Sequence, residues 1–277
     1  RVQHLGDRDI VSALEGLKII EFSTSLAAAW CGRLFADLGG DVVFRDPHAL
    51  REIGPFDKDG RSVIAELALA NKKSFAASIT VDELRALLSA ADVVINDALP
   101  GTEARTHLDS LVSDFAHVVY VSITPHGLSG ARSHQPGNDL TASARSGWAS
   151  VNGLSKKSPL KQTGYQASFQ AGTTAFAGAV SALIFKNKNG MGQSIDVGLD
   201  DASVMCFAPG ILRSVYNNYP VKRRRSIDMT SGPVPVKDGH FALTITRPHF
   251  WQGAMKLLGL KDLAEEPSLQ STANRNA

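Results

Sequence analysis

Ser168 lies at the centre of the stretch GYQASFQAG, residues 164–172, directly before a long run of small residues typical of a helix. A serine hydroxyl is neutral at physiological pH and becomes a nucleophile only when a general base accepts its proton. His126 and His134, in the segment PHGLSGARSH, are the histidines nearest in the chain. The G-x-S-x-G pattern of many hydrolases does not surround Ser168. Two interpretations stay open, a serine nucleophile or a serine that packs in the first turn of a helix.

Cationic side chains near two expected strands could bind the phosphates of a ligand. Lys72 and Lys73 stand in NKKS, residues 71–74, and Arg105 follows the loop NDALPG, residues 96–101. Lysine and arginine are the side chains that pair with phosphate groups. The turn FSTSLAAAW, residues 22–30, precedes a helix whose free N–H groups could receive an anion.

The sequence patterns of several common cofactor sites are absent from this chain. The turn after the first strand contains no glycine, although the backbone of a dinucleotide site needs one to approach the pyrophosphate. The chain also has no P-loop, no HExxH and no cluster of residues with metal-ligand spacing. We therefore expect neither NAD nor FAD, and no metal.

Short apolar runs alternate with amphipathic segments through the first two thirds of the chain, which favours an α/β fold. A first run, a helix beginning near Ser23 to Ser25 and stopped by Gly39 and Gly40, and a second run form a βαβ start. Four or five parallel strands followed by a last strand predict an open, doubly wound, Rossmann-like sheet, with a ligand at the carboxyl ends of the strands. The expected strands are residues 17–22, 41–46, 71–79, 91–97, 117–124 and 193–199.

The later part of the chain predicts long helices and then a boundary. We expect helices over 167–185 and 200–216, and a linker over 220–238 that is rich in proline, glycine and charge. The large domain would then be residues 1–219, and residues 239–277 would begin a small α+β domain. Those last residues are too few for an independent core.

Composition is that of an ordinary globular protein, with 43% hydrophobic residues, 20% charged residues and a net charge of +2. This charge does not favour nucleic acid or a membrane as partner. Cys31 and Cys206 lie far apart in apolar sequence, as buried free thiols do, so we expect a cytoplasmic protein. No continuous apolar run reaches the roughly 20 residues of a membrane span.

Six motifs, in this order and at these separations, carry a family resemblance. They are LEGLKIIEFSTSLAAAWCGRLFADLGGDVVFRD, ANKKS, ADVVINDALPG, VVYVSITPHGLSGARSHQPGNDLTASARSG, GYQASFQAG and NGMGQSIDVGLDDA. Together they resemble the family III CoA-transferases, which include formyl-CoA transferase, carnitine CoA-transferase and α-methylacyl-CoA racemase. The resemblance runs from about Leu14 to the stretch KDGHFALTI, and NGMGQSIDVGLDDA is its most specific part.

The resemblance implies a dimer of two interlocked chains and coenzyme A or an acyl-CoA as substrate, with a carboxylic acid as the second reactant. It also implies that the chain, which ends at EEPSLQSTANRNA, lacks the C-terminal third of the family. In the family an aspartate attacks the thioester, and its position matches Ser168. Racemases of the family carry a histidine where this chain has Asn138, next to an acid that matches Asp139, our candidate for residual acid–base work.

Roles follow from the matched positions. The resemblance implies that Ser25, Leu26 and Ala27 face the pantetheine end of CoA, and that Lys73 and Arg105 approach its phosphates or adenine. Lys72, beside Lys73, is a further candidate for binding this ligand. Asp97 stands where the family often has an asparagine near the CoA sulfur, with Asn138 nearby. A carboxylate at Asp97 adds negative charge close to an anionic thiolate, which disfavours transfer.

Four hypotheses remain. In the first, the chain binds CoA or acyl-CoA but lacks the nucleophile, and it acts as a homodimer or beside an active family III subunit. In the second, an active transferase has had its aspartate replaced by Ser168 by design. The third is a serine-dependent acyl-CoA hydrolase, and the fourth is a non-enzymatic assembly module that does not bind CoA.

Overall fold

The structure is a computed structural model of the 277-residue chain. It describes residues 12–46, 48–75, 79–218, 223, 233–242, 245, 247–271 and 274–276. The chain divides into two compact units, one made of Arg1–Asn152 and Leu160–Val221, the other of Gly153–Pro159 and Lys222–Ala277. The larger unit contains the parallel sheet and the cavity described below.

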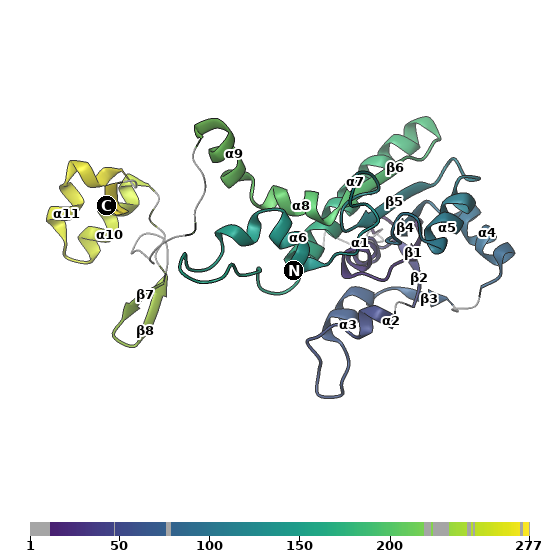
Figure 1. The fold of residues 1–277 in the computed structure, drawn as a ribbon, viewed down its shortest axis with the longest axis horizontal. Helices are drawn as coiled ribbons and strands as arrows, with labels where there is room; N and C mark the ends of the chain where they lie inside the picture. Colours follow the sequence, from purple (N-terminus) through teal and green to yellow (C-terminus); the bar gives the residue numbers. More distant parts are fainter. Residues whose placement is uncertain are drawn as a thin grey trace, which may run out of the picture. The chain divides into compact units, whose positions relative to one another are not determined.

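Six parallel strands form the sheet of the larger unit (Figure 1). They are β1 (Lys18–Phe22), β2 (Asp41–Arg45), β3 (Lys73–Phe75), β4 (Val93–Asn96), β5 (Val119–Thr124) and β6 (Ser194–Gly198). Their order is β3-β2-β1-β4-β5-β6, so the direction of winding reverses between β1 and β4. The prediction of an open, doubly wound α/β sheet is confirmed.

Neighbouring residues of a strand point to opposite faces of the sheet, and here both faces carry apolar side chains. Helices therefore cover both faces. Ile19 packs with α1 (Leu26–Asp37), α7 (Gln166–Asn189) and α8 (Leu199–Cys206) on one face. Ile20, its neighbour, packs with α4 (Val81–Ala90) and α5 (Glu103–Val112) on the other. Helix α1 begins where the sequence predicts, because Ser25 accepts a hydrogen bond from the Ala28 N–H at 3.4 Å.

Helix α7 is long and apolar enough, by length and composition, to cross a membrane. Serine, threonine and glutamine interrupt its apolar residues, so it does not show as a continuous apolar run in the sequence. Its alanines at 171, 175, 179 and 182 are buried against the sheet and α1, which is the position of a core helix. Figure 1 shows α7 running along β5 and β6.

Shorter helices complete the larger unit. They are α2 (His48–Arg51), α3 (Val63–Leu69), α6 (Asp139–Arg145), the 3-10 turn η1 (Trp148–Val151) and α9 (Ala208–Asn217). The sequence predicts one helix over 200–216, but the structure ends α8 at Cys206 and begins α9 at Ala208. Pro209 explains the interruption, because it has no N–H to continue the hydrogen bonds of α8.

The smaller unit contains a hairpin and short helices. The hairpin pairs β7 (Pro233–Val236) with β8 (Gly239–Ala242), and the helices are α10 (Pro248–Leu257), α11 (Lys261–Glu265), η2 (Pro267–Gln270) and η3 (Asn274–Asn276). Trp251 and Met255 form its core with Ile245 and Ala264. Strand β7 lies inside the segment 220–238, which the sequence predicts to be a linker. Its prolines do not prevent a strand here, because proline is tolerated on the free edge of a two-stranded sheet. Most of that segment lies outside the described residues.

Candidate functional site

A cavity of about 500 Å³ opens at the carboxyl ends of β1, β4, β5 and β6. It lies where the winding of the sheet reverses, which is the usual place for a ligand in an open α/β sheet. Its size is within the range of pockets that hold drug-sized ligands. The lining residues are Thr24, Ser25, Leu26, Ile53, Asp97, Leu99, Ile123, Pro125, Pro136, Gly137, Asn138, Asp139, Leu140, Lys161, Tyr165, Ser168 and Leu199.

Asp97 joins the loops after β1 and β4 at one side of the cavity. Its carboxylate accepts hydrogen bonds from the backbone N–H groups of Thr24 at 2.7 Å and Ser25 at 2.6 Å, and from the Thr24 hydroxyl at 3.1 Å. Burial raises the pKa of Asp97, although these donors oppose the effect. The carboxylate thus fixes the turn that leads into α1.

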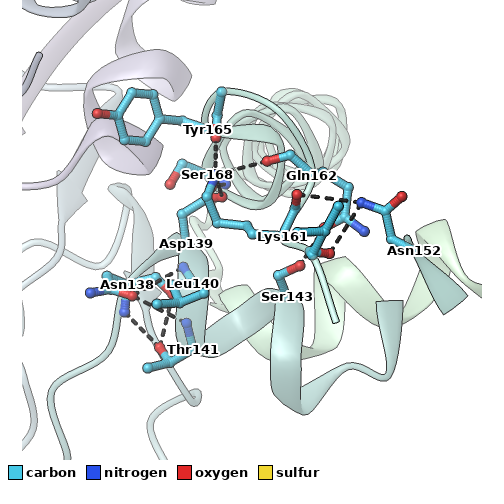
Figure 2. A network of polar contacts seen from close by, with 12 residues as sticks. Asn138, Asp139, Leu140, Thr141, Ser143, Asn152, Lys161, Gln162, Tyr165 and Ser168 are labelled. Atoms are coloured by element: carbon cyan, nitrogen blue, oxygen red, sulfur yellow. Dashed lines mark hydrogen bonds and ion pairs between the residues drawn. The ribbon is translucent and has the colours of Figure 1, made fainter. Parts of the chain in front are cut away.

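Asp139 lies on the other side of the cavity, where it binds the first turn of α7 (Figure 2). Tyr165 precedes this helix and provides no side-chain cap. Instead, the Asp139 Oδ1 accepts the backbone N–H of Ser168 at 2.8 Å. A carboxylate is well suited to this position, because a helix N-terminus has free N–H donors and a partial positive charge.

Lys161 is the cation of this network. Its ammonium lies 3.4 Å from the Asp139 Oδ2, donates to the Gln162 carbonyl at 2.8 Å, and donates to the Gly164 carbonyl. It also lies 5.7 Å from the ring centre of Tyr165. All three ammonium protons therefore have protein acceptors. Lys161 ties the loop before α7 to α6.

Ser168 lines the cavity, with 7% of its surface exposed. Its backbone is held by Asp139, but none of the hydrogen bonds among the described residues involves its Oγ atom. His126 pairs with Asp200 at 2.9 Å, and His134 with the Pro100 carbonyl at 2.9 Å. Neither histidine is hydrogen-bonded to the serine. The described contacts give Ser168 no general base.

Asn138 is the N-cap of α6 and also lines the cavity. Its Oδ1 accepts the N–H groups of Leu140 at 3.0 Å and Thr141 at 3.1 Å. The Thr141 hydroxyl accepts the Asn138 N–H at 2.8 Å, which completes a reciprocal cap. This cap presents Asp139 to α7 from the first turn of α6.

The three cations expected at the phosphates lie elsewhere. Lys72 donates to Glu21 at 2.7 Å in an ion pair with no exposed surface on either side chain. Burial lowers the pKa of Lys72 and raises that of Glu21. Lys73 is exposed and pairs with Asp41, at the amino end of β2. None of these residues lines the cavity.

Arg105 likewise does not line the cavity. It is buried on α5, where its Nε donates to Asp109 at 2.8 Å and its guanidinium lies 5.4 Å from the Tyr120 ring centre. At the start of α1, the N-cap Ser25 and Leu26 line the cavity, whereas Ala27 is buried in the core. The structure thus brings together Ser25, Leu26, Asp97, Asn138, Asp139 and Ser168.

Sequence reasoning missed Lys161 and Tyr165. Lys161 meets Asp139 across 22 residues of chain, so no local pattern shows the pair. Tyr165 donates to the Gly54 carbonyl at 2.7 Å, across 111 residues. Over the described ranges, no group of three or more His, Cys, Asp or Glu side chains could hold a metal ion.

Comparison with known families agrees with the α/β sheet. The sequence model of CoA-transferase family III matches residues 14–277. The chain belongs to this family. Two family III relatives and a solved structure define how far the similarity extends.

The first relative is the subunit BbsE of a succinyl-CoA:(R)-benzylsuccinate CoA-transferase from Thauera aromatica, 30% identical over 77% of this chain. The second is a probable fatty acyl-CoA transferase, Rv3272, from Mycobacterium tuberculosis, 26% identical over 95% of this chain. The chain spans 55% of the length of the first and 73% of the second. A crystal structure of a CAIB/BAIF family protein from Brucella suis is 26% identical and has a TM-score of 0.80. This match covers 95% of this chain and 74% of that protein.

Proposed function

We propose that this chain binds CoA thioesters in the cavity at Ser168, as a subunit of a family III CoA-transferase that lacks the nucleophile. The single observation that carries the proposal is the position of Ser168, which lines the cavity and whose hydroxyl is hydrogen-bonded to no base among the described residues. The two substrates are the CoA thioester of one carboxylic acid and a second, free carboxylic acid. We place the protein in the cytoplasm.

The chemistry depends on the side chain at this position. A carboxylate oxygen attacks the thioester carbonyl carbon, CoA leaves as its thiolate, and an acyl anhydride forms on the protein. The thiolate then attacks the protein carbonyl, and the acid leaves as its carboxylate. A serine would form an ester, and an ester of serine cannot become a protein-bound CoA thioester.

Asp139 does not replace the missing nucleophile. Its Oδ1 accepts the Ser168 N–H, and its Oδ2 faces the Lys161 ammonium. The carboxylate is buried and engaged on both oxygens. We assign it a positioning role, in which it fixes the first turn of α7 at the cavity.

An aspartate-bearing subunit would carry the covalent steps. The relative BbsE supports this arrangement, because it is itself described as a subunit of a CoA-transferase. The partner that carries these steps is a second family III chain with an aspartate at the position of Ser168. A homodimer of this chain would bind CoA thioesters but could not perform the covalent steps, since both copies carry the serine. The two interlocked chains expected from the family remain part of the proposal.

A transfer assay on the full-length protein tests the proposal. We expect the native protein to bind acetyl-CoA in a calorimeter but not to exchange CoA between acids when it is alone. Ser168→Asp should gain exchange, and hydroxylamine should displace the acid or CoA from its activated aspartate, leaving an aspartyl hydroxamate that mass spectrometry detects. Ser168→Asn has the same shape without a nucleophilic carboxylate, so it should stay inactive.

The outcomes separate the alternatives. Absence of CoA binding at millimolar ligand would overturn the proposal in favour of an assembly module. Exchange by the isolated native protein would contradict a subunit that lacks the nucleophile. Hydrolysis of acetyl-CoA that disappears in Ser168→Ala would favour a serine hydrolase.

A further inference from the structure

We infer that the acyl group accepted by the cavity at Ser168 is an uncharged hydrocarbon chain or ring, and not a dicarboxylic acyl group. This inference rests on the proposed function, because it names the substrate class of the same site. It comes from the chemistry of the cavity wall and from the use of its only cation among the described residues.

The wall of the cavity is largely apolar. Leu99 follows β4, Ile123 is the next-to-last residue of β5, and Leu199 follows β6, so the carboxyl-end regions of three strands each contribute an aliphatic side chain. Ile53 and Leu140 add two more from other segments. Each buried methylene tightens binding about threefold to fourfold, so this wall selects for carbon content.

The charges of the cavity oppose a second carboxylate. Lys161 is the one lysine or arginine among the lining residues that the structure describes, and its three protons already have acceptors. Asp97 and Asp139 also line the cavity. The lining thus carries two carboxylates and one cation that is already paired. A succinyl or glutaryl group would bring another negative charge to a site with no free cation in the described part of the chain.

Neutral donors remain where a thioester carbonyl needs them. The hydroxyl of Ser168 and the amide of Asn138 both line the cavity, and the hydrogen bonds of Asn138 leave its amide N–H₂ group unused within the described residues. A neutral donor suits a neutral carbonyl oxygen, whereas a free carboxylate favours a cationic partner. The polar groups of the site therefore match the thioester end of an uncharged acyl chain.

Calorimetry with three probes tests the substrate class in the full-length protein. The probes are CoA, hexanoyl-CoA and succinyl-CoA, which share the nucleotide and differ in the acyl group. We expect hexanoyl-CoA to bind at least about tenfold more tightly than succinyl-CoA. Beyond the thioester carbonyl, the hexanoyl group has about three more hydrocarbon carbons to bury than the succinyl group, and it carries no charge.

A variant adds a cation to the wall. Leu140 is 58% exposed on α6 beside the cavity, so Leu140→Arg should fold and supply a free cation. It should improve the affinity for succinyl-CoA relative to hexanoyl-CoA by about tenfold. Val81, 50% exposed on α4, covers no part of the cavity, and Val81→Arg should change neither affinity.

The results distinguish failure of the inferred substrate class from failure of the proposed function. Equal or tighter binding of succinyl-CoA to the native protein would overturn the substrate class and leave the proposed function in place. An unchanged preference in a folded Leu140→Arg variant would also overturn it, since the acyl group would then lie away from α6. Failure of all three probes to bind would overturn the proposed function and this inference with it.

Discussion

Replacing Asp97 by alanine removes the acceptor that fixes the turn before α1. Two backbone N–H groups, those of Thr24 and Ser25, lose carboxylate bonds of 2.7 and 2.6 Å. Hydrogen bonds to a charged group contribute about 1.5–3 kcal/mol each. Thr24 is exposed, so water replaces part of this loss. We expect a destabilisation of about 3 kcal/mol, which lowers the melting temperature by about 6–12 °C in a domain of this size.

Asp97→Asn is the matched control. Both backbone N–H groups bind the same oxygen, Oδ2, so one amide oxygen can accept both. The amide N–H₂ group can then donate to the Thr24 hydroxyl in place of the third bond. We expect this variant to lie within about 1 kcal/mol of the native protein in urea unfolding.

The pH dependence gives a second readout. Burial raises the pKa of Asp97, so the folded state binds a proton at this group more tightly than the unfolded state. Stability from such a group falls as pH rises from its unfolded value of about 3.9 through its folded pKa. Asp97→Asn has no such titration, so it should gain stability relative to the native protein from about pH 4 upward. Equal losses in the alanine and asparagine variants, or a pH trend of opposite sign, would refute this account.

Two further variants test the packing around the cavity. Lys72→Met should cost about 3–5 kcal/mol in urea unfolding, because Glu21 is left buried without its partner, and adding Glu21→Gln should restore most of the loss. A double variant as unstable as Lys72→Met would contradict this. Gly172→Ala should cost about 1–3 kcal/mol, because its Cβ would meet the Ala27 carbonyl oxygen where α1 crosses α7. A native melting temperature in that variant would show that the two helices separate freely.

The sheet was predictable from local patterns, and the polar network was not. Buried parallel strands show as short apolar runs, and the serine cap of α1 shows as a serine before a helical pattern. Lys72 and Glu21 are 51 residues apart, so their pair has no local signal. Neighbouring residues at a strand point to opposite sides, which explains why Lys72 is buried and Lys73 is exposed. That alternation could have separated the two lysines in advance.

The buried charges around the cavity favour ligand binding over a purely structural role. Burying a carboxylate costs free energy, and well-packed apolar residues often make a more stable protein. This chain nevertheless places Asp97 and Asp139 at the cavity, each fixing a turn by accepting backbone N–H groups. A module that only assembles gains nothing from a cavity of about 500 Å³ held open by such groups. A site that must hold a thioester in a fixed orientation does gain from them, even though Ser168 cannot form the anhydride.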